Sequence, residues 1–155
     1  MASTLTAAAL TVTITENIEL NGKDQGGSNV LTIGSINEIS KRIVTVTTTE
    51  ATILTFSAAV GQGTYIAANV RYMRFTNLDD TNHIMLTFKD EDNTEFRVKV
   101  DAGQSFIFNG DNSGGVVDTM KANGSALSSG LADLYDVTAD ADTASCDLEI
   151  FIASA

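Results

Sequence analysis

The feature that most constrains the fold of this chain is an apolar–polar alternation with a period of two. It begins in residues 10–15 (Leu-Thr-Val-Thr-Ile-Thr) and returns in residues 53–57 and 146–152, while residues 43–49 are β-branched throughout. Such alternation is typical of a β-strand with one buried face, whereas an amphipathic helix needs a period near 3.6. Stretches rich in Asn, Gly and Ser, such as residues 21–29, separate the runs and predict loops.

The most sharply defined element is a hairpin over residues 84–100. Centring its turn on residues 90–94 places Lys89 opposite Glu95 and Phe88 opposite Phe96. The same register brings further apolar pairs together on one face and leaves polar residues toward solvent: Leu86 with Val98, Ile84 with Val100, and Thr87, Arg97 and Lys99 on the solvent face. A slip by one residue would invert every side chain, so the pattern fixes this register.

About eight short strands with turn signals between them predict an all-β fold, an antiparallel β-sandwich of jelly-roll-like type with little helix. The length of 155 residues fits one domain. We expect the small and polar residues 1–9 to form a flexible N-terminal arm and residues 10–155 to form a single sandwich domain. Residues 131–138 fit a strand or a helical turn, and residues 109–130 predict a long connection that carries a short strand.

Composition excludes several functional classes. Twenty acidic against nine basic residues give a net charge of −11, which argues against general nucleic-acid binding because phosphates require clustered Lys and Arg. No apolar run approaches the roughly 18 residues of a membrane span, and the first ten residues lack the basic start of a signal peptide. The single cysteine, Cys146, excludes an intrachain disulfide, and its place on the apolar side of the last strand predicts a buried, inert thiol.

Residues 110–115 (Gly-Asp-Asn-Ser-Gly-Gly) come close to the Gly-Asp-Ser-Gly-Gly loop around the nucleophile of trypsin-like serine proteases. The extra Asn112 would displace the hydroxyl from the oxyanion-hole amides, and a catalytic triad also needs a histidine with an orienting carboxylate. The one histidine, His83, instead opens a hairpin strand. We therefore interpret the motif as a glycine-rich loop, assign no catalytic, cofactor-binding or metal-ligating residue, and expect no enzymatic activity.

Two acidic loops, residues 78–82 and 90–95, carry the oxygen ligands that calcium favours. The second loop lacks the central glycine and distant glutamate of an EF-hand and already serves as the hairpin turn, so solvated turns are the simpler interpretation. His83 beside Asp79 and Asp80 falls short of the three or four ligands of a zinc site. We expect His83 to be partly exposed at a strand entrance.

Three weaker signals are also interpreted as structural. Residues 61–63 (Gly-Gln-Gly) lack the third glycine of a dinucleotide-binding loop, and residues 123–125 form a glycosylation triplet without a secretion signal. The tyrosines do not cluster along the sequence as an aromatic sugar platform would: Tyr65, Tyr72 and Tyr135.

A resemblance to a known class of protein lies between Arg74 and Phe108. Residues 74–82 (Arg-Phe-Thr-Asn-Leu-Asp-Asp-Thr-Asn) contain a strand end of the form Thr-Asn-x-Asp that leads into the hairpin, and residues 101–106 contain an x-Ala-Gly-x-Ser-Phe turn that leads into the next strand. This arrangement resembles a β-sandwich segment in structural proteins of tailed-bacteriophage virions, among them capsid decoration proteins. The match covers about a quarter of the chain.

The resemblance implies a non-enzymatic virion structural protein, first of all a capsid decoration or cement protein that is made in the host cytoplasm and resides in the virion. Its partners would be the phage major capsid protein or other virion proteins and further copies of itself in a homo-oligomer, with no cofactor, nucleic acid or membrane. The alternatives are a tail, baseplate or fibre component and a calcium- or glycan-binding β-sandwich module. Residues 70–75 are apolar or aromatic on both faces of their strand, from which we expect a surface buried by another subunit.

Overall fold

The structure is a computed structural model that describes residues 4–109, 118–120 and 132–155. Its strands are β1 (Ala8–Glu16), β2 (Glu19–Leu20), β3 (Lys23–Asp24), β4 (Gly27–Ile36), β5 (Glu38–Val46), β6 (Ala51–Ser57), β7 (Thr64–Ile66), β8 (Val70–Asn77), β9 (Ile84–Asp90), β10 (Glu95–Val100), β11 (Ser105–Asn109), β12 (Asp118–Met120), β13 (Ala132–Ala141) and β14 (Cys146–Ser154). One short 3-10 helix, η1 (Ala67–Asn69), lies between β7 and β8.

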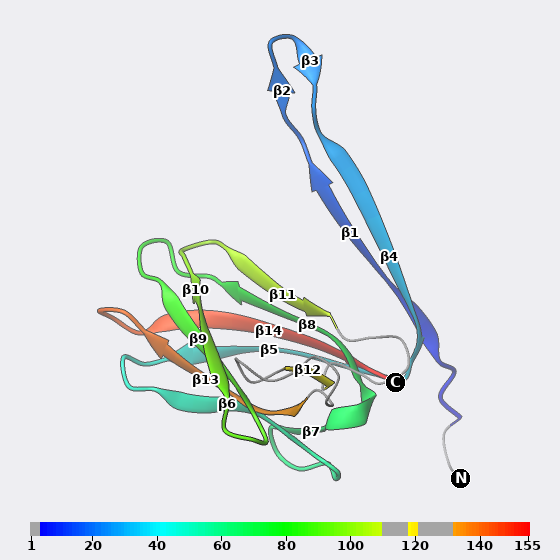
Figure 1. Cartoon of the computed structure of the whole chain (residues 1–155), viewed down its shortest axis with the longest axis vertical. Helices are drawn as coiled ribbons and strands as arrows, with labels where there is room; N and C mark the ends of the chain where they lie inside the picture. The colour runs from blue at the N-terminus through cyan, green and yellow to red at the C-terminus, as the bar shows by residue number, and fades with distance from the viewer. Residues whose placement is uncertain (1–3, 110–117, 121–131) are drawn as a thin grey trace.

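Two sheets face each other as a sandwich (Figure 1). One has the strand order β11-β8-β14-β5, and the other has the order β10-β9-β13-β6-β7, with β12 beside β13. When β7 and β12 are set aside, the remaining strands follow the jelly-roll order, in which successive strands cross between sheets except at the β9–β10 hairpin. The predicted all-β, jelly-roll-like antiparallel sandwich is therefore confirmed.

The main core lies between these two sheets and is centred on Phe88. Its ring meets Phe75 edge-on at 5.7 Å and stacks on Phe96 at 5.0 Å and on Phe108 at 5.3 Å. Fully buried aliphatic residues from both sheets surround this aromatic cluster: Leu54, Leu86, Val137, Leu148 and Ile150. Each such side chain contributes roughly 1.5–3 kcal/mol of burial, so the core holds the two sheets together.

The hairpin over residues 84–100 is confirmed in its register. Lys89 pairs with Glu95, Phe88 with Phe96 and Ile84 with Val100. One detail of the prediction is wrong, because Thr87 is buried rather than facing solvent. The reason is the position of β9 between β10 and β13, which places Thr87 between Arg97 and Thr138, and alternation along one strand does not reveal that position.

Other predictions meet the structure with mixed results. Residues 132–141 form the strand β13 rather than a helical turn, and the closing strand predicted over residues 146–152 is β14. A short strand, β12, occurs in the predicted long connection. The protease-like motif at residues 110–115 and the triplet at residues 123–125 lie outside the described residues.

The largest difference from expectation is at the beginning of the chain. β1 and β4 form a two-stranded sheet of their own that projects from the sandwich, and β2 pairs with β3 at its tip (Figure 1). We call this element, Ala8 to Ile36, the arm. The loop predicted over residues 21–29 was too long, because residues 23–24 are paired and residues 27–29 belong to β4. The sandwich itself starts at β5 rather than at residue 10, and the projecting element extends well beyond residues 1–9.

Two glycines shape the tip of the arm. Gly22 has a positive φ of 71° beside Asn21 at 53°, which is the left-handed turn that joins β2 to β3. A β-carbon at Gly26 would collide with the carbonyl oxygen of Glu16. The close approach of the two chain segments at this point therefore requires glycine.

Candidate interaction surface

The arm has one apolar face and one threonine-rich face. Residues paired across β1 and β4 point to the same side, so Leu10 joins Ile33 and Val12 joins Leu31, whereas Thr11 joins Thr32 on the other side. The alternation in residues 10–15 thus produces an amphipathic ribbon.

At its base, the apolar face of the arm covers part of the outer face of the β11-β8-β14-β5 sheet. Ile33 and Ile36 are buried there against Tyr72 and Ala153. Partly buried residues from both partners surround this second, smaller core: Leu10, Val12, Leu31, Ile107 and Phe151. The base of the arm is therefore anchored on its own sandwich.

This contact explains the mixed character of strand β8. Met73 and Phe75 face the main core, whereas Tyr72 faces the base of the arm. At Tyr72 the surface that we expected another subunit to bury is covered by the chain's own arm. That expectation is therefore wrong for this residue.

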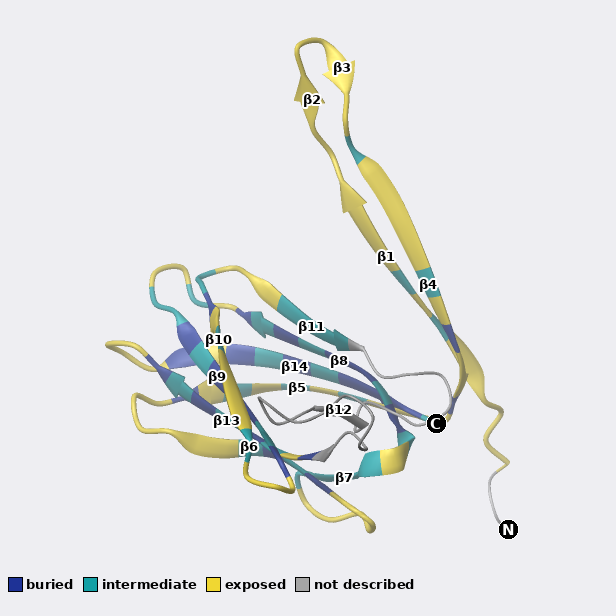
Figure 2. Cartoon of the chain, viewed as in Figure 1, coloured by how far each residue is buried: buried dark blue, intermediate teal, exposed yellow. Residues whose placement is uncertain are grey.

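Beyond its base the arm leaves the sheet and its apolar residues become exposed (Figure 2). On the apolar face Ile14 is 44% exposed, and Ile18 and Leu20 beyond the end of β1 are exposed by more than half. Val30 is also exposed, on the threonine-rich face opposite Thr13. A lone two-stranded ribbon is marginally stable in water and has an unpaired edge along each strand. The distal arm therefore has the features of a surface that a partner completes.

A second exposed apolar surface lies on β5, at the edge of the same sheet. Ile39 and Ile43 point to the outer face and are 58% and 59% exposed, with Lys41 between them. On the neighbouring strand β14, Phe151 lies opposite Lys41 and Glu149 lies opposite Ile43. Among the described residues no strand pairs with the outer edge of β5.

Charged side chains lie beside Ile39 and Ile43 on the same face of the sheet. Lys41 Nζ lies 3.1 Å and Arg74 Nη2 lies 2.7 Å from the two carboxylate oxygens of Glu149. The hydrogen bond from Arg74, followed by that from Lys41, lowers the pKa of Glu149. Two cations thus share the carboxylate of Glu149, and a second carboxylate, Asp147, lies on the same face where it accepts a hydrogen bond from Thr45.

A cleft of about 320 Å³ separates the arm from this sheet face. Arm residues 10–14 form one wall, and Tyr72, Arg74, Ile107 and Phe151 form the other. The guanidinium of Arg74 lies 5.9 Å from the ring centre of Phe151, so a cation covers part of the aromatic surface. The cleft continues the anchoring contact outward along the arm.

The outer face of the opposite sheet is charged. Lys89 lies between Glu95 and Asp136 on adjacent strands, and Arg97 pairs with Asp140. One buried oxygen of Asp136 has no hydrogen-bond partner among the described residues, and burial raises the pKa of this carboxyl, with smaller contributions from nearby Glu50 and Glu95. Among the described residues, this sheet exposes Phe96 and Tyr135 as its large apolar residues, whereas the arm and β5 together expose six.

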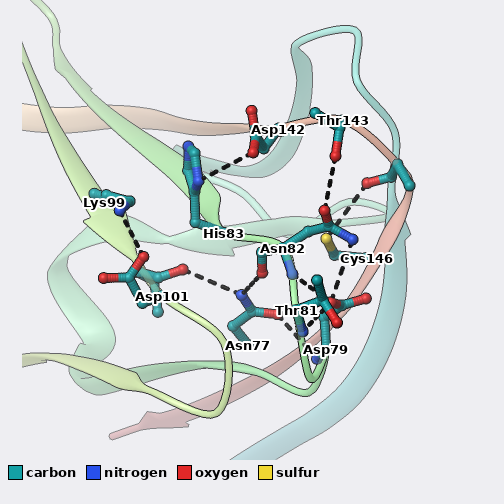
Figure 3. A network of polar contacts seen from close by, with 12 residues as sticks. Asn77, Asp79, Thr81, Asn82, His83, Lys99, Asp101, Asp142, Thr143 and Cys146 are labelled. Atoms are coloured by element: carbon teal, nitrogen blue, oxygen red, sulfur yellow. Dashed lines mark hydrogen bonds and ion pairs between the residues drawn. The ribbon is translucent and has the colours of Figure 1, made fainter.

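The acidic loop at residues 78–82 is held by hydrogen bonds within the chain (Figure 3). Asp79 Oδ1 accepts hydrogen bonds from the amides of Asn82 at 2.6 Å and Thr81 at 2.8 Å, which lower the pKa of Asp79. Asn77 is fully buried. Its side-chain nitrogen donates hydrogen bonds to the carbonyls of Asn82 and Val100, and its side-chain oxygen accepts a hydrogen bond of 3.0 Å from the backbone amide of Asp79. These contacts give the loop a structural role.

The two stretches that carry the resemblance to virion proteins meet at this loop. The backbone amide of Asn77 donates a hydrogen bond to the Gln104 carbonyl at 3.0 Å, and the backbone amide of Gly103 donates one to the Asn77 carbonyl at 3.1 Å. Gly103 has a φ of 72°, which explains the glycine in the turn. The hydroxyls of Thr76 and Ser105 lie 2.7 Å apart. The motif residues therefore build one joint between β8 and β11.

The remaining candidate residues do not assemble into a reactive site. His83 is partly exposed before β9, as expected, with Nδ1 3.5 Å from Asp142. Cys146 is buried as predicted. Its burial raises the pKa of the thiol, and the nearby carboxylate of Asp79 raises this pKa further. Residues 90–94 form the hairpin turn, in which Asp90 accepts from the Thr94 amide. Within the described ranges, no three His, Cys, Asp or Glu side chains converge to hold a metal.

The other weak signals also occupy structural positions. Residues 61–63 form the turn before β7, with Gly63 at a φ of 71°. The three tyrosines lie on different strands, Tyr65 on β7, Tyr72 on β8 and Tyr135 on β13. Tyr65 donates its hydroxyl hydrogen to Ser40 at 2.8 Å, which ties β7 to β5.

In the part of the chain that the structure describes, no helix has the length and apolar character needed to cross a membrane. No family model, curated protein or solved structure matches this chain. The features of the chain that bear on its function are the arm, the exposed face of β5 and the motif resemblance described above.

Proposed function

We propose that this chain is a non-enzymatic structural subunit of a virion, with capsid decoration as its role and the arm as its means of attachment. The observation that carries the proposal is the arm, whose base is anchored on its own sheet while Ile18, Leu20 and Val30 stay exposed. The virion assignment itself rests on the resemblance between Arg74 and Phe108.

The physical mechanism is attachment through many modest contacts. Burying each exposed arm residue against a neighbour contributes about 1.5–3 kcal/mol, part of which offsets the cost of ordering the arm. One such contact is weak, but copies on a lattice act together because each bound neighbour raises the effective concentration of the next contact. The charged outer face of the other sheet would then point to solvent.

The fold is compatible with this role without specifying it. Jelly rolls occur in viral capsid proteins and also in lectins, and one fold serves many functions. The arm favours an assembly role over a ligand-binding role, because it places apolar side chains on a projecting ribbon.

The test is the composition of purified particles from the source of this chain. We expect the protein in a fixed stoichiometry to the major capsid protein, measured by quantitative mass spectrometry. A variant in which an Asn-Gly turn joins Thr15 to Ser28 should be lost from the particles, because these residues pair directly and the shortened hairpin can still close. The control is Val60→Asp, which alters an exposed loop residue outside the arm and should be retained.

Other results would move or remove the proposal. Recovery with isolated tails and absence from heads would assign the chain to the tail, baseplate or fibre. Absence from every particle, combined with a melting temperature that calcium or a glycan raises, would replace the proposal with a ligand-binding module.

A further inference from the structure

We propose that β1 in the arm of one copy adds alongside the edge strand β5 of a second copy, with Glu16 of the first opposite Lys41 of the second. This inference deepens the proposed function by naming a partner for the arm. It concerns the purified chain alone, so it can fail or succeed independently of the virion assignment.

The two strands carry matching side-chain patterns. Residues 14, 16 and 18 are Ile, Glu and Ile, and residues 39, 41 and 43 are Ile, Lys and Ile. Residues 39, 41 and 43 share one face of β5, and Ile14 and Glu16 share one face of β1. Ile18 follows two residues after the end of β1, where its carbonyl accepts a hydrogen bond from the Gln25 amide. When Glu16 lies opposite Lys41, isoleucines meet isoleucines on either side of the charge pair in both parallel and antiparallel registers.

The exposed apolar residues of the molecule gather on these two elements. Among the described residues, six of the eleven exposed large apolar side chains lie on the arm or on the outer face of β5: Ile14, Ile18, Leu20, Val30, Ile39 and Ile43. The distal arm points away from β5 of the same copy (Figure 1), so it does not cover that strand. The arm of a second copy would cover β5, and β5 of a second copy would cover the arm.

The charges of the two surfaces are also complementary. The distal arm carries Glu16, Glu19 and Asp24 against Lys23, a net charge of −2. On β5 the exposed cation Lys41 lies between Ile39 and Ile43, at the position proposed for contact with Glu16, while Arg74 also neutralises Glu149, the carboxylate that Lys41 contacts. In a chain of net charge −11, two copies repel in most orientations, and this pairing is favoured because it brings unlike charges together.

The backbones of the two strands are suited to pairing. β1 and β5 each span nine residues, and each has one edge without a paired strand among the described residues. Addition of β1 would extend the sheet through main-chain hydrogen bonds, while the side chains set the register. The two surfaces differ, so the contact is heterologous and propagates from copy to copy into a ring or an open array.

The first experiment measures self-association of the full chain by sedimentation velocity over a concentration series. We expect the wild type to associate, and we expect two double variants to weaken this association by about tenfold or more, which corresponds to loss of one buried isoleucine contact. The donor variant is Ile14→Asp with Ile18→Asp, and the acceptor variant is Ile39→Asp with Ile43→Asp. The control Val60→Asp should associate like the wild type.

The decisive step mixes the donor variant with the acceptor variant. One intact β5 and one intact arm then remain, so we expect the mixture to form a heterodimer that stops at two copies. A wild type that stays monomeric at high concentration, or a mixture that forms no heterodimer although both variants keep their circular dichroism, would overturn the inference.

A charge exchange tests the register and does not depend on the aspartate variants. We expect Glu16→Lys and Lys41→Glu each to weaken association and the double variant to restore it at low salt. Two weakened single variants without restoration would refute the pairing of Glu16 with Lys41. An arm that is needed on particles while the purified chain stays monomeric would mean that the arm binds another protein, which would also refute this inference and leave the proposed function standing.

Discussion

At the scale of single residues, Asn77 shows how one buried amide can hold a loop end together. Its side chain hydrogen-bonds to Asp79 and Asn82 in the acidic loop and to the carbonyl of Val100 at the end of β10. This asparagine belongs to the Thr-Asn-x-Asp motif, and its hydrogen bonds give the motif a structural reason. A structural reason of this kind can arise in unrelated sandwiches, so the motif alone does not specify function.

We predict that Asn77→Ala lowers the free energy of unfolding by roughly 2–4 kcal/mol, because it leaves buried carbonyl groups without donors. Urea unfolding followed by circular dichroism measures the change. The matched control is Asn29→Ala on the exposed arm, which should change stability by less than about 0.5 kcal/mol. Equal effects from the two substitutions would show that Asn77 does not hold the loop.

Asp136 is a residue whose ionised side chain lowers the stability of the fold, in contrast to the stabilising side chain of Asn77. Its pKa in the folded state is raised above the unfolded value of about 3.9, so the folded protein holds the proton more tightly. Stability is therefore lost as the pH rises from the unfolded pKa through the folded pKa. We predict that Asp136→Asn raises the melting temperature at neutral pH and that the difference from wild type disappears in acid below both pKa values.

Thermal unfolding across a pH series measures this difference. Asp92→Asn, in the exposed hairpin turn, is the control and should behave like the wild type throughout. A gain that stayed constant down to strongly acidic pH would point to packing rather than to the ionised carboxylate.

At the scale of elements, the arm divides into an anchored base and an exposed distal part. Ile33→Ala removes a residue that is 3% exposed in the smaller core, and we predict a loss of about 2–3 kcal/mol in stability. Ile14→Ala, on the same face of the arm but farther from its base and 44% exposed, should cost much less. Chemical denaturation of the two variants measures the contrast, and equal losses would mean that the arm is covered along its whole length.

The elements also show what the sequence can predict. The β9–β10 hairpin was predictable because its alternation, charge pair and turn all require one register. The arm was harder, because residues 10–15 have the pattern of a half-buried strand wherever the covering surface comes from. Leu10 and Val12 find that surface within the chain, whereas Ile14 remains exposed.

The candidate surface was less accessible to sequence reasoning than the fold. Ile39, Lys41 and Ile43 alternate like any strand, and their exposure follows from the position of β5 at the edge of a sheet. Edge position depends on the order of strands that are distant in sequence, which local pattern does not encode. One signal was present: residues 14, 16 and 18 repeat the pattern of residues 39, 41 and 43 with the central charge reversed.

At the scale of the whole molecule, the sandwich has two different sides. One outer face carries interleaved charges, including Lys89 between Glu95 and Asp136. The other carries the arm, the cleft beside it and the exposed isoleucines of β5. This asymmetry suits a subunit that lies on an assembly with one side toward its neighbours and the other toward solvent.

The most direct measurement of the central claim is cryo-electron microscopy of the source particle. We predict that the sandwich occurs in many symmetry-related copies, that each arm lies against a neighbouring subunit, and that the charged sheet faces outward. Particles that lack the sandwich, or copies whose arms extend into solvent without touching a neighbour, would contradict the account.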